Sequence, residues 1–418
     1  MAPRAGEVAA VAATSAGRSV LACRGAQVGS RSLPGTACRL LAALLPCALW
    51  PAGQVQAVVL PEERADAMYH RYDGGGVTVD GPALLVRKNF RETLSVSGSY
   101  YVDNVSSASI DVVTSGASGY SEQRTEYSVG AQYLYDKSIL SAGYSNSDES
   151  DYNADTWYLN VSQDFFGDLT TVTFGYTRGE DDVYQNGNAE FAGDIERQHF
   201  RLGVSQIATP SLLLSLDYEL ITDEGYLNNP YRSYRYLSDP LDPAAGYQFA
   251  REVYPDTRTS DAAALRGLYY LPGRHTMGGG YRYFTDDWGI DAHTLDIGYT
   301  HAWNEHWVFD LKYRYYWQTG ADFYSDLFEF ASQDDKDWRA RDKELSEFDN
   351  QTVSLYVTYE RPLRYRLFER AAVVLQWDHV WFDYQDFSDL RAAVDTPGEE
   401  PAYDFEADIL KLVFTLWY

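Results

Sequence analysis

Apolar and polar residues alternate with a period of two along most of this chain, and this feature restricts the fold more than any other. The clearest run is residues 307–318, where one face is aromatic or aliphatic throughout and the other includes Asp310, Lys312 and Arg314. A strand places such residues on opposite faces, whereas a helix would spread them around its axis. Similar runs recur along the chain, and no helical segment competes with them after residue 70. The pattern predicts an all-β protein.

The connections between these runs alternate between short and long. The short ones are Lys88–Arg91, Asp136–Ser138, Phe166–Asp168, Thr209–Ser211, Pro272–Arg274, Asn304–His306 and Arg361–Phe368. The long ones, rich in Asp, Glu, Pro and Asn, are Asn104–Tyr120, Asp181–Asp194, Asp223–Asp256, Ala321–Glu347 and Gln385–Pro401. Tight turns at one end and long loops at the other are typical of an outer-membrane β-barrel. A soluble β-sandwich also alternates, but the long runs and the aromatic weighting of the apolar face favour a lipid-facing wall.

The hairpins and the parity of bacterial barrels together predict the number of strands. Residues 403–418 form the closing strand, and residues 65–73 must form a strand before Val77–Lys88 if both chain ends are to lie on the periplasmic side. We therefore expect a transmembrane antiparallel β-barrel of about 16 strands. A barrel of this size encloses an aqueous lumen unless loops fill it.

Charge and composition exclude several classes of protein. The chain has 61 Asp and Glu against 34 Lys and Arg, a formal net charge of −27. Nucleic acid is not an expected partner, because its binding needs a basic face. The 35 Tyr, 18 Phe and 10 Trp argue against disorder, because disordered chains are poor in aromatic residues.

Residues 1–57 differ from the rest and predict a signal peptide. Arginines are followed by a short apolar stretch at residues 40–50 and by a small-residue exit at residues 55–57, which are the parts of a secretory signal. The apolar stretch is shorter than the roughly 20 residues of a spanning helix. We expect residues 58–418 to be the mature barrel. All three cysteines lie in the leader, at Cys23, Cys38 and Cys47, so the mature barrel would form no disulfide.

The end of the chain carries a more specific pattern. Alternate positions are apolar up to an aromatic last residue: Leu410, Leu412, Phe414, Leu416 and Tyr418. This pattern resembles the C-terminal strand that the bacterial barrel-assembly machinery recognises, so we interpret it as an assembly signal. The expected location is the bacterial outer membrane. The expected partners there are its lipid and lipopolysaccharide together with the assembly machinery.

Several segments resemble one family in particular. They are residues 82–88 (PALLVRK), 149–152 (ESDY), 281–294 (YRYFTDDWGIDAHT), 313–318 (YRYYWQ) and 321–325 (ADFYS). They are similar to the uncharacterised bacterial outer-membrane proteins grouped as domain-of-unknown-function family 3570. The resemblance implies a fold and a location, and it assigns no catalytic residue. Such proteins are often encoded beside thioredoxin-like proteins and flavin-attaching transferases, which implies a periplasmic partner of one of these kinds.

The alternation also predicts which charged residues line the lumen. They are Arg201, Asp217, Glu219, Arg266, Arg282, Asp296, Asp310, Lys312, Arg314 and Asp378. Inward placement is favoured because a basic residue on the lipid face costs about 2–4 kcal/mol at the bilayer midplane. Two interpretations stay open: a self-neutralising network that fills the lumen, and a constriction that selects solutes.

A porin-like channel or transport protein is the leading hypothesis for function. The alternative is a barrel that serves as a docking scaffold for a periplasmic redox or flavoprotein partner. An outer-membrane hydrolase is the weaker hypothesis, because His293, His301 and His306 suit strand ends and turns better than a catalytic group. No cofactor or dedicated metal site is predicted. The acidic stretches at residues 148–151 and 334–337 lack the ordered spacing of a calcium loop.

Overall fold

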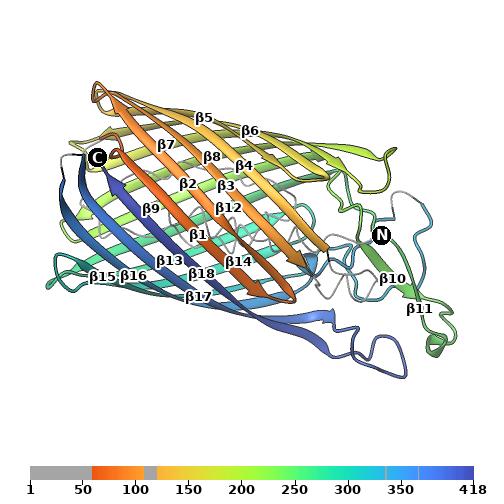
Figure 1. Ribbon diagram of the computed structural model, residues 1–418. Helices are drawn as coiled ribbons and strands as arrows, with labels where there is room; N and C mark the ends of the chain where they lie inside the picture. Colours follow the sequence, from red (N-terminus) through yellow and green to blue (C-terminus); the bar gives the residue numbers. More distant parts are fainter. Residues whose placement is uncertain (1–58, 108–119, 335–336, 366) are drawn as a thin grey trace.

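The chain forms a closed antiparallel barrel of sixteen strands (Figure 1). This computed structural model describes residues 59–107, 120–334, 337–365 and 367–418. The barrel strands follow one another around the wall in chain order, and the first closes on the last. The expected fold class is confirmed, and so is the strand number. The predicted signal peptide and its boundary at residue 57 lie outside the described residues.

The strands of the barrel are between 11 and 21 residues long. They are β1 (Arg64–Gly74), β2 (Val77–Phe90), β3 (Leu94–Ser107), β4 (Tyr120–Tyr135), β5 (Ser138–Asp148), β6 (Tyr152–Phe165), β7 (Thr170–Tyr184), β8 (Ala192–Thr209), β9 (Leu212–Gly225), β12 (Thr257–Leu271), β13 (His275–Asp286), β14 (Asp291–Ala302), β15 (Trp307–Gln318), β16 (Phe348–Tyr365), β17 (Phe368–Ser388) and β18 (Ala402–Trp417).

The connection between β9 and β12 contains further structure. The strands β10 (Ser233–Leu237) and β11 (Tyr247–Arg251) form a separate two-stranded sheet, which lies beyond the end of the barrel opposite the C terminus (Figure 1). The part of the chain that the structure describes also has two short 3-10 helices, η2 (Pro243–Ala245) in this connection and η3 (Lys343–Leu345) between β15 and β16. Within the described residues, no helix is both long and apolar enough to cross a membrane.

One end of the barrel carries the tight turns. The start of β1 and the end of β18 lie at this same end. Arg64 at the start of β1 pairs with Trp417 at the end of β18. In the turn before β5, Asp136 has a φ of 52°, and in the turn before β7, Phe166 has a φ of 53°. Left-handed residues of this kind match the twist of a tight hairpin. We call this the inner end, and we call the end with the long loops the outer end.

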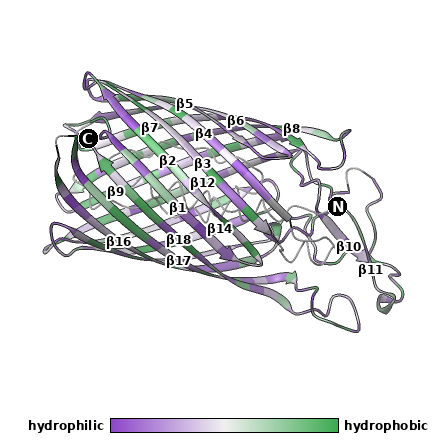
Figure 2. Cartoon of the chain, viewed as in Figure 1, coloured by the Kyte–Doolittle hydropathy of each residue, from purple (hydrophilic) through white to green (hydrophobic). Residues whose placement is uncertain are grey.

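The outside of the barrel is an apolar wall. Val86, Val129, Leu216, Leu265 and Leu311 come from different strands, and each is 54–57% exposed. Hydrophobic and hydrophilic residues alternate along the strands in Figure 2. Such extensive apolar exposure is unsuited to water, and a bilayer is the solvent that accepts it.

Tyrosines near the outer end of this wall join the apolar band to a polar rim. The Tyr69 hydroxyl donates to Asp80 at 3.0 Å, and the Tyr283 hydroxyl donates to Asp291 at 2.6 Å. Tyr218 donates in the same way to Asp261. An aromatic ring in lipid with its hydroxyl at the polar boundary is the usual arrangement of an aromatic girdle.

We expect the barrel to resist unfolding by detergent. Every strand of the barrel has a hydrogen-bonded neighbour on each side, so the barrel has no open edge from which unfolding could start in detergent. Unboiled and boiled samples should therefore migrate at different positions on a denaturing gel, and the protein should fractionate with the outer membrane. Identical migration together with periplasmic solubility would contradict the barrel.

The residues of the predicted assembly signal lie on the last strand and next to the seam. Leu410, Leu412 and Phe414 are exposed on the lipid face, and Leu416 is half-buried. The Tyr418 hydroxyl donates to the backbone oxygen of Arg87 at 2.9 Å. The pattern thus lies where the first and last strands meet.

Deletion of Leu416–Tyr418 should prevent insertion. It removes the β18 partners of Arg64 and Ala65 and the aromatic terminus, so unfolded and protease-sensitive protein should accumulate in the periplasm. Tyr418→Phe is the matched control, because it keeps the ring and loses only the hydrogen bond to Arg87. Normal insertion of the deletion variant would show that the terminal pattern is only a strand.

Candidate functional site

The charged residues expected in the lumen form ion pairs along the inner face of β8 to β15. Asp217 on β9 binds two guanidinium groups, Arg201 Nη2 at 2.6 Å and Arg266 Nη1 at 2.7 Å. Arg282 Nη2 on β13 lies 3.2 Å from Glu219 Oε2 on β9. These contacts bring together residues from β8, β9, β12 and β13.

The same arrangement continues on the next two strands. Arg314 Nε on β15 donates to Asp296 Oδ1 on β14 at 2.7 Å. We call the set Arg201, Asp217, Glu219, Arg266, Arg282, Asp296, Lys312 and Arg314 the charged strip. Each of its four arginines is bound to one of its three carboxylates, with Asp217 shared by two of them, so five basic and three acidic residues leave the strip a formal net charge of +2.

Three of the predicted lumen residues are outside these pairs. Asp310 accepts a hydrogen bond from Thr300, and Asp378 accepts one from Gln376. Lys312 is in the strip but forms no ion pair with a carboxylate of the described residues; its Nζ lies 4.8 Å from the centre of the Tyr356 ring. The structure therefore pairs seven of the ten expected lumen residues with one another and leaves these three with other partners.

A second polar network lies on the other side of the barrel, and sequence reasoning missed it. His70 Nε2 on β1 is 2.8 Å from Asp103 Oδ1 on β3, and the Tyr101 ring stacks on the His70 ring at 4.8 Å. In the strand register His70 lies opposite Gly81 on β2, where an added Cβ would lie 1.9 Å from the Val102 oxygen. The inward parity of His70 was visible in the sequence, but its partner two strands away was not.

The long loops pack together at the outer end and form a cap. The guanidinium of Arg235, on β10, is fully buried and binds Asp326 in the β15–β16 loop. It also donates to Glu400 in the β17–β18 loop at 2.7 Å. Arg341 Nη2 lies 2.8 Å from Asp326, so one carboxylate holds two arginines. This cluster, which we call the arginine clasp, ties three loops to one another.

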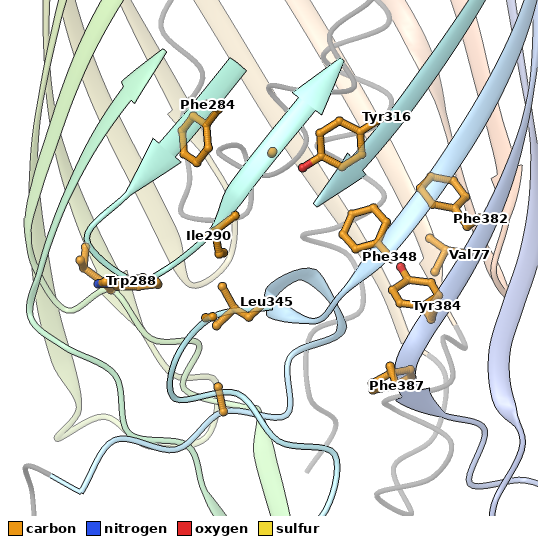
Figure 3. Packing of buried hydrophobic residues seen from close by; sticks show 14 of the residues in the cluster. Val77, Phe284, Trp288, Ile290, Tyr316, Leu345, Phe348, Phe382, Tyr384 and Phe387 are labelled. Atoms are coloured by element: carbon orange, nitrogen blue, oxygen red, sulfur yellow. The ribbon is translucent and has the colours of Figure 1, made fainter. Parts of the chain in front are cut away.

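Beneath the clasp, apolar side chains fill the outer end of the lumen. Leu345 of η3 lies between Ile290 and Trp288 on one side and Phe348 on the other (Figure 3). The same cluster extends to Tyr72 on β1 and includes buried residues from strands all around the wall. Among the described residues, packed side chains therefore fill much of the outer end of the lumen.

The cap also contains two neighbouring acidic residues, Glu252 and Asp342, and the pKa of Glu252 is shifted. Glu252 is buried, accepts from the backbone N–H of Arg341 at 2.7 Å, and accepts from the Tyr254 hydroxyl at 2.7 Å. Arg232 binds Asp342, whose carboxylate lies 3.5 Å from the same hydroxyl. Burial, together with the negative charge of Asp342, raises the pKa of Glu252 to about 7.

The acidic stretches considered for metal binding have partners of their own. The carboxylates of Glu122, Glu149 and Asp151 lie within 4.8 Å of one another. Arg124 Nε is 3.8 Å from Glu149, and the backbone N–H of Ser150 donates to Glu122 at 3.2 Å. In the other stretch, residues 335–336 lie outside the described residues, and Arg339 holds the pKa of Asp337 below its usual range. We interpret both as ion-paired loops.

The histidines considered for catalysis lie on the outside of the wall and at a turn. His293 stacks on Trp317 at 4.7 Å and bonds to the Tyr281 hydroxyl at 2.6 Å. His301 stacks on His275 at 4.2 Å, and His306 Nδ1 lies 2.9 Å from the backbone oxygen of Glu360. His293 and His301 therefore pack among the aromatic rings on the outside of the wall, and His306 contacts the backbone at a turn.

A family model matches more than half of the chain. It is described as "Protein of unknown function (DUF3570)" and matches residues 111–362. The chain belongs to this family. The resemblance drawn from the sequence segments is thus confirmed, and the family's description assigns no activity.

Solved structures resemble this DUF3570 protein only in fold. The siderophore receptor PirA from Pseudomonas aeruginosa is 9% identical with a TM-score of 0.40, and the match covers 85% of this chain and 63% of that one. OmpT of Vibrio cholerae is 11% identical with a TM-score of 0.40, over 86% and 100% of the two chains. A Pseudomonas aeruginosa FadL homologue is 10% identical with a TM-score of 0.39, over 85% and 90%. A search of curated proteins gave no match.

The cap should loosen as pH rises, because of Glu252. A carboxyl whose pKa rises on folding from 4.5 to about 7 stabilises the folded cap below pH 4.5 and loses that contribution as pH rises through 7. Hydrogen-exchange protection in residues 226–256 and 319–347 should fall by up to about tenfold per pH unit in this window.

The variant Glu252→Gln keeps the shape of the side chain and removes its titration. The groups that face Glu252 are Tyr254, Asp342, Arg232 and Arg341, and all of them remain in the variant. Its cap protection should depend less on pH between 4.5 and 8 than that of the wild type. An unchanged pH dependence in the variant would assign the effect to another group.

Proposed function

We propose that this protein is a channel or transport barrel of the bacterial outer membrane whose outer mouth is closed by its own loops. The observation that carries the proposal is that side chains of the charged strip are partly exposed to solvent. Arg266 and Glu219 each keep 24% of their side-chain surface exposed, and Asp296 keeps 21%, although all three face inward. Solvent therefore reaches the lumen wall below a cap in which Arg235 has no exposed surface.

The pairing within the strip supports passage rather than tight capture of ions. An isolated charge in a low-dielectric lumen repels one sign of solute and traps the other. Pairs such as Arg314 with Asp296 leave little net field for a passing solute. A wall of this kind suits a small polar solute, including one with a single anionic group, better than a highly charged one.

The arginine clasp supports a closed resting state. Arg235 is buried between Asp326 and Glu400, and removing one partner of a buried ion pair leaves the other charges uncompensated, at a cost of about 3–5 kcal/mol. The three loops should then separate more readily, while the β-strands of the barrel wall do not depend on this contact.

The variant Arg235→Ala should open the channel in planar bilayers. We expect the wild-type protein to conduct rarely and the variant to show more frequent and longer openings, because the loops lose their common partner. Arg251→Ala is the matched control, since Arg251 lies in the same small sheet and is exposed. Equal conductance of all three proteins would show that the arginine clasp does not control opening of the channel.

The absence of any current in all three proteins would contradict a transport role. The docking barrel would then be the better proposal, with a thioredoxin-like protein or a flavin-attaching transferase as the periplasmic partner. Its test is co-purification of one such partner with the wild-type barrel, and loss of that partner when the inner-end turns are substituted. Neither proposal assigns the protein an enzymatic activity.

A further inference from the structure

We propose that Lys312 is a binding subsite for an oxyanion, the carboxylate or phosphate group of a solute in the lumen. The inference deepens the transport role proposed above and rests on it in part. It starts from a contrast within the charged strip. Each of its four arginines lies within 3.2 Å of a lumen carboxylate, whereas Lys312 makes no such contact among the described residues.

The ammonium group of Lys312 has unused hydrogen-bonding capacity. Its Nζ atom is shielded from solvent and has no hydrogen-bond partner among the described residues. Its one identified contact is the face of the Tyr356 ring, at 4.8 Å from the centroid. A cation–π contact offsets only part of the cost of a buried ammonium that lacks hydrogen bonds.

The residues beside Lys312 on neighbouring strands are small. In the strand register it lies opposite Gly298 on β14 and opposite Ser354 on β16. The next residue in the row beyond Gly298 is Gly278, on β13. Backbone without side chains therefore borders the lysine on one side, and a hydroxyl borders it on the other.

The charges around Lys312 favour an anion. Arg314, two residues along β15, is also basic, although it is bound to Asp296. Two acidic residues of the same wall each have a donor of their own, because Asp310 Oδ1 accepts from Thr300 and Asp378 Oδ2 accepts from Gln376. An ammonium offers three donors and no acceptor, so the ligand that completes it is an oxygen anion, which would replace the Tyr356 ring as the partner.

The test measures anion binding directly, without relying on current. Purified wild-type barrel in detergent is titrated with inorganic phosphate and, separately, with acetate. We expect saturable binding of at least one of them, weakened about tenfold or more by Lys312→Met, because a hydrogen bond to a charged group contributes about 1.5–3 kcal/mol. Lys312→Arg should restore most of the affinity.

The matched control is Lys137→Met. Lys137 is exposed at an inner-end turn and pairs with Asp168 at 2.6 Å, so this variant removes the same charge outside the lumen and should bind like the wild type. Each variant is first checked for heat-dependent gel migration, which reports an intact barrel. Binding that is absent in the wild type, or equal in Lys312→Met and the wild type, would overturn the subsite.

Conductance then separates the two proposals. In an Arg235→Ala background, Lys312→Met should shift the reversal potential in a salt gradient toward cation preference. Lys312-dependent binding without any current would keep the subsite and remove the transport role. Current whose selectivity and anion affinity are both unchanged by Lys312→Met would keep transport and remove the subsite.

Discussion

The whole structure depends on the requirement that no backbone amide or carbonyl is left unpaired in lipid. A sheet satisfies that requirement only when its first and last strands meet. Here β1 pairs with β18 over its full length, from Arg64 to Gly74. Closure fixes the inward parity of every strand, and parity places apolar residues in lipid and charged residues in the lumen. The charged strip and the buried His70 network are consequences of this closure.

Much of the wall was predictable because its determinants are local. The alternation along residues 307–318 and the tight turn at Asp136 each depend on neighbouring residues, and the structure has both as expected. The inward set containing Arg201 and Asp217 followed from parity alone. The pairing of Arg266 with Asp217, in contrast, depends on the register between β9 and β12 across a long loop, which alternation does not fix.

The cap was not predictable, because its loops have no period and its contacts are remote in sequence. Arg235 and Glu400 are 165 residues apart, and Arg235 and Asp326 are 91 apart. The long loops are rich in Asp and Glu, and they also hold buried arginines that bind several carboxylates. Buried pairs of this kind contribute little net stability compared with apolar packing, but breaking them is costly. The clasp thus fixes which loops meet, while the cluster around Leu345 and Trp288 supplies the apolar burial.

The unequal lengths of the strands give the barrel a sloping rim. At roughly 3.3 Å per residue, the 21 residues of β17 extend about 30 Å farther than the 11 residues of β5. The arginine clasp and Phe387 lie on the tall side, where Arg341 also reaches the backbone of Ser388. On the low side the cap is held by smaller contacts, such as that between Tyr231 and Asp151. If the cap opens as proposed, the contacts on the tall wall would keep it attached there and it would separate first beside β5 and β6, so that a solute would enter at an angle to the barrel axis.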